Sequence, residues 1–175
     1  DILLWPLESI LLESNLISKD IDLKLKKEIS DSIIPKLTKA AEKVDPADSS
    51  LIALDWLNGR RTPFADQKLK GAILGVSLGT NAPGLFRALV EATAFGAKAI
   101  VDRFRSEGIT IKEIVAIGGI PKKSPLVMQI LSDVLAMPVK VVRSEQAVAL
   151  GAAMFGAVVA GIYPTVGKAQ IKMAS

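Results

Sequence analysis

The chain has 175 residues and a formal net charge of +4, and half of it is hydrophobic, which is enough for one domain with a sizeable core. It contains no cysteine and no histidine, so this chain has no disulfide bond, thiol nucleophile, histidine general base or common zinc site. Its basic residues lie in short runs without interleaved stacking aromatics, which argues against nucleic-acid binding, and the missing cysteines fit a cytoplasmic protein.

The first 44 residues are expected to form a helical appendage or lid. Asp1–Leu16 is an apolar segment compatible with a helix. Asp20–Val44 has a charged helical pattern, and we expect Pro35 to kink or divide it because proline removes a backbone hydrogen bond. The chain opens without a methionine and ends without a helix cap, so we expect a piece of a longer protein, cut at both ends.

Residues 45–81 are predicted to hold one strand and several turns. Asp45–Ser50 is a polar turn cluster, and Leu51–Leu54 is compatible with a strand. The Asn58-Gly59 pair that follows is a strong turn signal, whose simplest interpretation is hairpin chemistry. The segment Gly71–Gly79 is rich in glycine, but its glycines are too widely spaced for a dinucleotide fingerprint.

A long helix is predicted next. Asn81 can cap its first turn, Pro83 suits its first position, and Gly108 suits the position just after its end near Glu107. Two neighbouring apolar rows run along it, which predicts a helix that is buried over much of its surface.

The central unit of the chain reads as strand, glycine turn, helix and strand. Glu113–Ile117 is predicted to be a buried strand, Gly118 and Gly119 a tight turn, and Ser124 the cap of a helix that ends before the strand Val139–Val142. A glycine pair between a strand and a helix is where open α/β sheets bind ligands. From spacing alone, a ligand on bare main chain and a tight turn packed on the next helix are equally good interpretations.

The remaining residues are expected to be helical. Ala147–Ala160 is predicted to be a buried helix whose Gly151 and Gly156 allow close approach of another element, and Lys168–Ser175 begins a further helix. The apolar stretch Ala147–Ile162 is shorter than the roughly 20 residues that cross a membrane, so no membrane span is expected. The alternation of strands and helices predicts α/β layers with a partly parallel sheet.

Catalytic residues are harder to find. Asp102 and Asp133 fall late in predicted helices, where a solvated or ion-paired role is the usual one. Asp55 follows a strand, but the neighbouring Trp56 and the turn after it offer a structural role instead. The sequence Pro121-Lys122-Lys123-Ser124 lacks the glycine that a phosphate-binding P-loop requires before its lysine, so the glycine pair is not a P-loop.

These residues resemble the FGGY family of carbohydrate kinases. The resemblance covers residues 45–175 well and the first 44 loosely. The adenosine signature of the family matches the glycine pair and residues after it: Gly118, Gly119, Ser124, Gln129, Asp133, Pro138 and Val139. Further similar stretches are Gly59–Pro63, Gly71–Thr80, the helix Pro83–Glu107 and Ala149–Ala153. Within the family, Leu54–Pro63, Ala92–Ala97 and Gln170–Ser175 are most similar to the kinases that act on L-ribulose.

The resemblance implies a fold and an activity. It implies a ribonuclease H-like, actin-like ATPase domain, a mixed sheet flanked by helices, with residues 1–44 as the helical appendage and 45–175 as most of the C-terminal, nucleotide-side domain. The full enzyme would use ATP and Mg²⁺ to phosphorylate the ketopentose L-ribulose on its 5-hydroxyl group, in arabinose breakdown. The partners would be ATP, the sugar and the N-terminal domain, and self-association through exposed apolar surface is a further expectation.

The resemblance also implies which residues bind the nucleotide. Gly118 and Gly119 would lie against the adenine and ribose, and Ile120 and Lys123 would line the same pocket. Three residues would stand on the other side, closer to the phosphates: Gly75, Thr80 and Asn81. The aspartate that takes the proton from the sugar precedes this segment in the family, so no catalytic residue is assigned here, and the chain alone is expected to lack kinase turnover. Two alternatives stay open, a xylulose or glycerol kinase of the same family and a non-catalytic actin-like nucleotide-binding or interaction module.

Overall fold

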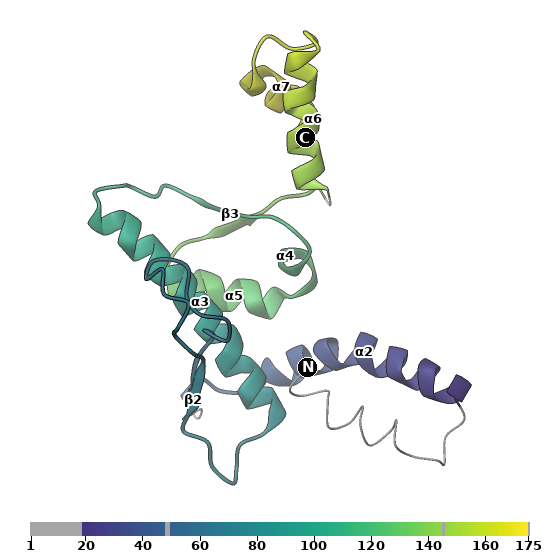
Figure 1. Cartoon of the computed structure of the whole chain (residues 1–175), viewed down its shortest axis with the longest axis vertical. Coiled ribbons are helices and arrows are strands. Elements are labelled where there is room, and N and C mark those ends of the chain that lie inside the picture. The colour runs from purple at the N-terminus through teal and green to yellow at the C-terminus, as the bar shows by residue number, and fades with distance from the viewer. Residues whose placement is uncertain (1–18, 48–49, 145, 175) are drawn as a thin grey trace. The chain divides into compact units, whose positions relative to one another are not determined.

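The computed structural model of the chain describes residues 19–47, 50–144 and 146–174. The chain divides into two compact units, residues 1–50 with 77–87 and residues 51–76 with 88–175. The helices and strands, labelled as in Figure 1, are α2 (Lys19–Ala41), β1 (Ile52–Leu54), β2 (Ala72–Leu74), α3 (Ala82–Ser106), β3 (Ile114–Ala116), α4 (Ile120–Lys123), α5 (Pro125–Leu135), β4 (Val139–Val141), α6 (Ala147–Val159) and α7 (Val166–Met173).

The described part of the first unit is built on α2. This helix runs through Pro35 without being divided, because the proline removes a single backbone hydrogen bond from a helix of 23 residues. Leu37 and Ala41 are buried, and the Arg87 guanidinium donates a hydrogen bond of 3.3 Å to the Ala41 carbonyl. The predicted helix at Asp1–Leu16 lies outside the described residues.

The second unit contains a small core between β1 and α3. The core consists of Leu51, Ala53, Ala88 and Ala92, with Leu89 packed against it. The alanines matter because short side chains allow a helix to lie close to a strand. The core therefore fixes α3 against β1, whose strand the sequence predicted.

β1 pairs antiparallel with β2, in the register Ile52 to Leu74 and Leu54 to Ala72. The sequence did not predict β2, because its three residues lie between Gly71 and Gly75 and glycine-rich sequence is poor in strand signal. The antiparallel partner, which is remote in sequence, supplies the hydrogen bonds that make this segment a strand.

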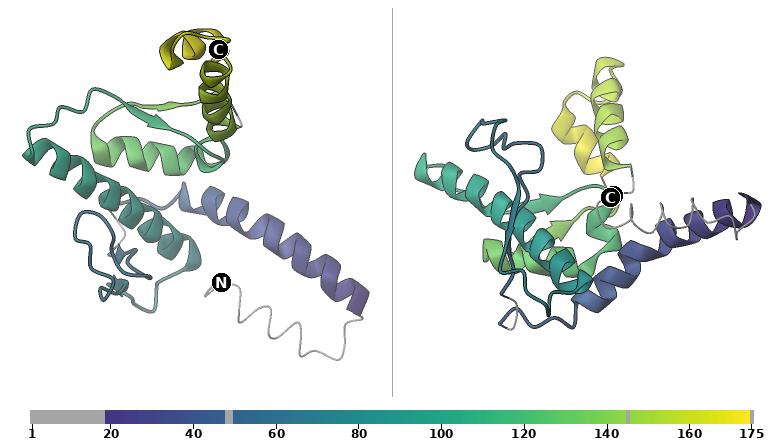
Figure 2. Two further views of the ribbon diagram at one scale, coloured as in Figure 1. Left: turned by 45° about the horizontal axis from the view of Figure 1, so that its top comes forward. Right: turned by 60° about the horizontal axis from the view of Figure 1, so that its bottom comes forward.

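β3 and β4 form a parallel pair joined through α4 and α5, in the register Ile114 to Val139 and Ala116 to Val141. Figure 2 shows α5 running beside this pair. The buried face of α5 carries Leu126, Ile130 and Leu135, close to the rows predicted from the sequence. The chain thus contains both parallel and antiparallel strand pairs, and among the described residues they form two separate ladders.

Capping explains where the central helices begin and end. The side chain of Ser124 accepts a hydrogen bond from the Val127 amide, as predicted. Gly108 has a φ of 79°, and the Ile109 amide bonds back to the Phe104 carbonyl, which makes the predicted glycine stop of α3. α5 ends with the same pattern of backbone bonds, but Ala136 occupies the left-handed position with a φ of 50°.

The predicted helix at Ala147–Ala160 is confirmed as α6, but the prediction that it is buried is wrong. Among its described side chains only Met154 is buried, whereas Val148, Phe155 and Val159 are 76%, 63% and 91% exposed. Their spacing places these three residues on one side of the helix. α6 is apolar all round, and α7 folds back against only part of it (Figure 1), so the opposite side stays exposed.

Fewer side chains of α3 are buried than its two apolar rows predicted. Ala88, Ala92 and Ala94 are buried, but Phe95 and Phe104 are exposed. Within the described ranges, none of the helices combines the length and the apolar character that crossing a membrane requires.

The first prediction concerns Ala136. Ala136→Gly should raise the free energy of unfolding by about 0.5–1 kcal/mol, because glycine adopts the left-handed conformation without the steric cost that alanine bears. Gly108→Ala is the matched control and should lower it by about 1 kcal/mol, since a methyl group there meets no atom within 4 Å and only the backbone is strained. Denaturant unfolding of the full-length protein measures both, and a destabilised Ala136→Gly variant would contradict the prediction.

Candidate functional site

The glycine pair forms a sharp corner after β3. β3 ends at Ala116, and Gly118 takes a φ of 102°, which favours glycine over any residue with a side chain. Gly119 returns to helical geometry and is the N-cap residue of α4. The corner therefore turns the chain from the strand into a short helix within three residues.

The corner is open. A Cβ atom built on either glycine would meet no atom within 4 Å. The next residue, Ile120, is 65% exposed, and α4 has no buried residue. Of the two interpretations left open by the sequence, a turn packed tightly against the following helix is not what the structure shows. What remains is bare main chain beside an exposed aliphatic side chain.

One contact ties this corner to the end of β4. The Lys122 ammonium group donates a hydrogen bond of 2.5 Å to the backbone carbonyl of Arg143, which lies two residues after β4. Lys123 is exposed beside it. The corner is therefore connected to both strands of the parallel pair, through the chain at β3 and through this hydrogen bond at β4.

The residues predicted to lie near the phosphates follow β2. Gly75 comes directly after the strand with a φ of 80°. The Thr80 hydroxyl accepts a hydrogen bond of 2.8 Å from the Ser77 amide, and the Asn81 side chain accepts one of 2.9 Å from the Gly84 amide. Asn81 is thus the predicted cap of α3, and Thr80 closes a turn just before it.

The structure groups only some of the seven predicted residues. Gly118, Gly119, Ile120 and Lys123 are consecutive or nearly so, and they share the second unit with Gly75. Thr80 and Asn81 belong to the first unit. That all seven residues border one nucleotide stays a prediction.

A partly buried arginine is the feature that the sequence did not predict. The Arg60 side chain is only 13% exposed. Its Nη2 donates a hydrogen bond of 2.7 Å to the Gly96 carbonyl on α3, and its Nη1 lies 3.4 Å from Asp55 Oδ1. A Cβ atom on Gly96 would lie 2.7 Å from Nη1, so the absent side chain is what admits the guanidinium. The signal in the sequence was a glycine within an alanine-rich helix.

This contact gives Asp55 a structural role. Asp55 follows β1 directly and pairs with Arg60 across the start of the connecting loop. An aspartate held by a partly buried guanidinium contributes to the fold and is a poor candidate for a proton acceptor. The Arg60 Nε atom is also buried and has no hydrogen-bond partner among the described residues. Burying that group is costly, and the two bonds at the other nitrogens offset the cost.

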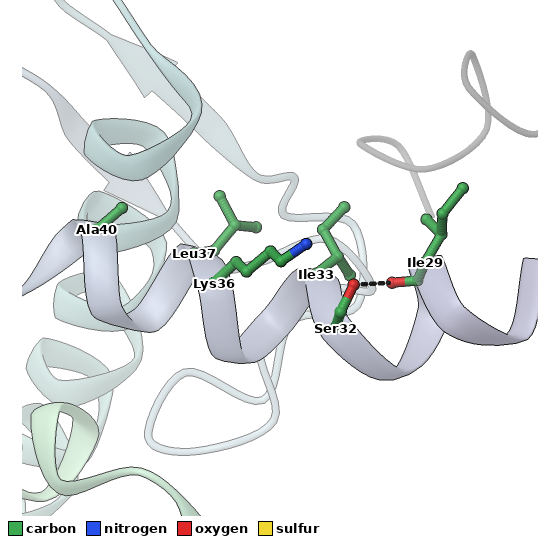
Figure 3. Close-up of a pocket in the computed structure, with 6 residues that line it drawn as sticks. All are labelled: Ile29, Ser32, Ile33, Lys36, Leu37 and Ala40. Carbon is green, nitrogen blue, oxygen red and sulfur yellow. Dashed lines mark hydrogen bonds between the residues drawn. The ribbon is translucent and has the colours of Figure 1, made fainter. Parts of the chain in front are cut away.

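A separate hollow lies on α2 (Figure 3). Its volume is about 370 Å³, and one face of the helix lines it with mainly aliphatic side chains: Ile29, Ser32, Ile33, Lys36, Leu37 and Ala40. The Ser32 hydroxyl is turned back to the Ile29 carbonyl at 3.4 Å. None of the predicted nucleotide-binding residues borders this hollow.

The described residues offer no cluster of metal-ligating side chains: no group of three acidic, histidine or cysteine side chains comes together among them.

Comparison with known proteins places the chain. Residues 11–160 match the model of the FGGY family of carbohydrate kinases, C-terminal domain. The chain is 49% identical over all 175 of its residues to a protein named ribulokinase from Vibrio parahaemolyticus, and 48% identical over 125 residues to one from Halalkalibacterium halodurans. These alignments include 100% and 71% of this chain, but the chain spans only 30% and 22% of the length of the two relatives.

Solved structures show the same fold. A xylulose kinase from Rhodospirillum rubrum matches 67% of the chain with 27% identity and a TM-score of 0.58, over 23% of its own length. A glycerol kinase from Plasmodium falciparum, solved with ADP, matches 86% of the chain with 22% identity and a TM-score of 0.67, over 30% of its own length.

The second prediction concerns Gly96. A helical glycine replaced by alanine normally gains stability, but Gly96→Ala should lose about 1–2 kcal/mol because the new methyl group displaces the Arg60 guanidinium from the Gly96 carbonyl. Gly151→Ala on α6 is the matched control, since open space surrounds that glycine, and it should gain about 0.5–1 kcal/mol. Equal shifts of the two variants in denaturant unfolding would show that Arg60 does not make the contact.

Proposed function

We propose that this chain, which belongs to the FGGY family of carbohydrate kinases, is the nucleotide-binding part of a kinase that transfers the γ-phosphoryl group of ATP to the 5-hydroxyl of L-ribulose. The actin-like ATPase fold of the family is the frame for this activity. The observation that carries the choice of sugar is the 49% identity, over every residue of the chain, to a relative named ribulokinase. L-Ribulose as substrate places the enzyme in arabinose breakdown, and we propose the cytoplasm as its compartment.

The glycine corner suits a flat aromatic base. Gly118 and Gly119 present main chain without side chains, and the exposed Ile120 lies next to them. A purine ring stacked on this surface would bury apolar area, while Lys123 stands where it can approach the ribose or a phosphate. We propose Gly75, Thr80 and Asn81 as the residues nearer the phosphates. ATP, when bound, supplies the phosphoryl group, and the residues of this chain bind and orient it.

Mg²⁺ is implied by the family's chemistry. Among the described residues no group of three acidic side chains comes together, but Mg²⁺ needs only one or two carboxylates when nucleotide phosphates and water supply its other oxygen ligands.

The proton acceptor for the sugar hydroxyl is proposed to lie in the N-terminal domain of the same protein. Asp55, the best placed acid of the described chain, is held by Arg60 instead. Phosphoryl transfer depends on positioning and on charge stabilisation around both substrates, so the chain alone should not turn over. Apolar side chains exposed here, such as those along α6, are available for that domain or for self-association.

The sister activities of the family are the second candidate. The solved structures that share the fold include xylulose, glycerol and gluconate kinases, so the fold does not select the sugar. A non-catalytic nucleotide-binding module is the third. A single assay separates all three.

The third prediction is that assay. ADP release by the full-length protein should be at least about tenfold more efficient, as kcat/KM, with L-ribulose than with xylulose or glycerol. The same assay with this chain alone should give no sugar-dependent ADP. A preference for xylulose or glycerol would favour the sister activities. If no sugar causes ADP release, the non-catalytic module is favoured. Turnover by this chain alone would refute a proton acceptor in the N-terminal domain.

The fourth prediction tests the corner. Gly119→Ala should leave the fold intact, because Gly119 has helical geometry and open space around it, yet it should raise the Kd for ATP about tenfold by placing a methyl group where the base lies. Gly156→Ala, equally open on α6, should leave that Kd unchanged. Calorimetric titration of the full-length protein measures both, and unaltered nucleotide binding by Gly119→Ala would move the site elsewhere.

A further inference from the structure

The glycine corner after β3 is not held in place by apolar packing. Ile117 and Ile120, on either side of the glycine pair, are 55% and 65% exposed. α4, which follows the pair, has no buried residue, and the first buried side chain after the corner is Leu126 of α5. A contact of another kind is needed to fix the position of Gly118 and Gly119.

Backbone hydrogen bonds join the corner to α4. The Lys123 amide donates to the Gly119 carbonyl at 3.2 Å, and the Ser124 amide donates to the Ile120 carbonyl at 3.0 Å. Because these bonds make a turn of helix out of residues 119–124, Gly119 and Ile120 move together with α4. A contact that holds α4 therefore also holds the surface on which a base would lie.

Lys122 is the side chain that ties α4 to the neighbouring strand. Just beyond the paired residues of β3 and β4, the Val142 amide donates a hydrogen bond of 3.1 Å to the Ala116 carbonyl. After Ala116 the first chain turns away at the glycine pair. The Lys122 ammonium group then bridges the two sides with its hydrogen bond of 2.5 Å to the Arg143 carbonyl, one residue after Val142. The connection between the two strands is thus continued by a side chain where the backbones separate.

We propose that Lys122 is a positioning residue for the base of the nucleotide: its bond to the Arg143 carbonyl holds α4, and with it Gly119 and Ile120, where they meet the adenine ring. This inference rests on the proposed function. A lysine suits the task because a hydrogen bond from a charged donor is stronger than one between neutral groups. Lys122 is also exposed, so it makes this bond without the cost of burying its charge.

The experiment compares adenosine, which has the base and ribose but no phosphate, with ATP. Lys122→Met keeps an unbranched side chain and a similar helix propensity but removes the donor, and because the position is exposed the variant should fold. In the full-length protein it should raise the Kd for adenosine and the Kd for ATP by the same factor, about fivefold, in calorimetric titration. In the kinase assay the KM for ATP should rise while the KM for the sugar stays the same.

The controls separate positioning from stability. Lys140 on β4 makes a similar link across the same strand pair, to Glu113, but at the opposite end of β3 from the glycine corner. Lys140→Met therefore removes a comparable contact and should leave both Kd values unchanged. Lys122→Arg keeps a charged donor on a long side chain, so it should bind both ligands within about twofold of the unchanged protein.

The outcomes distinguish this inference from the function on which it rests. If the unchanged protein binds neither adenosine nor ATP, the proposed function fails. If it binds ATP without measurable affinity for adenosine, the corner does not hold the base and the inference fails. If Lys122→Met weakens ATP alone, Lys122 contacts a phosphate directly, and the inference fails as well. If Lys122→Met changes neither Kd, or Lys140→Met raises both Kd values as much, Lys122 has only a structural role and the inference is overturned.

Discussion

In the second unit, a partly buried guanidinium group joins the end of a strand to a helix. The Arg60 side chain is 13% exposed, and it is tolerated there because the Gly96 carbonyl and the Asp55 carboxylate accept its hydrogen bonds. Removing one partner of such a contact is costly, because the other partner is left unpaired. The contact therefore links the end of β1 and the loop after it to α3, and the core of Leu51, Ala53, Ala88 and Ala92 packs the same strand against the same helix.

Glycines in this chain serve two opposite purposes. At Gly59, Gly71 and Gly96 a side chain would collide with a neighbour, so these glycines exist to let other parts of the protein come close. At Gly118 and Gly119 no neighbour is near, so internal packing does not explain the absence of side chains. Gly118 is accounted for by its φ of 102°, but Gly119 has ordinary helical geometry. Gly151 and Gly156 on α6 are open in the same way, so an open glycine does not by itself indicate a bound ligand, and the place of Gly119 between a strand and a helix is what singles it out.

The sequence predicted the features that neighbouring residues determine, such as helix caps and helix ends. Ser124 and Asn81 were expected as helix caps and make the expected bonds, and Gly108 stops α3 in the left-handed conformation. It did not predict β2, whose strand character comes from a partner about twenty residues away. It also did not predict the partial burial of Arg60, which depends on a glycine 36 residues later. The sequence also did not predict the exposed side of α6, because an apolar helix indicates burial but does not indicate which element covers it. At the candidate site, the turn at Gly118 and Gly119 was predictable, but its openness required the surrounding structure.

Part of the stretch that most resembles the ribulose-directed kinases makes contacts within the fold. In Leu54–Pro63, Asp55 and Arg60 face each other and α3, and Gly59 makes room for Gln67. Contacts of this kind within the fold account for these residues without a sugar contact, so their similarity to the kinases named ribulokinase indicates the family more directly than it indicates the sugar.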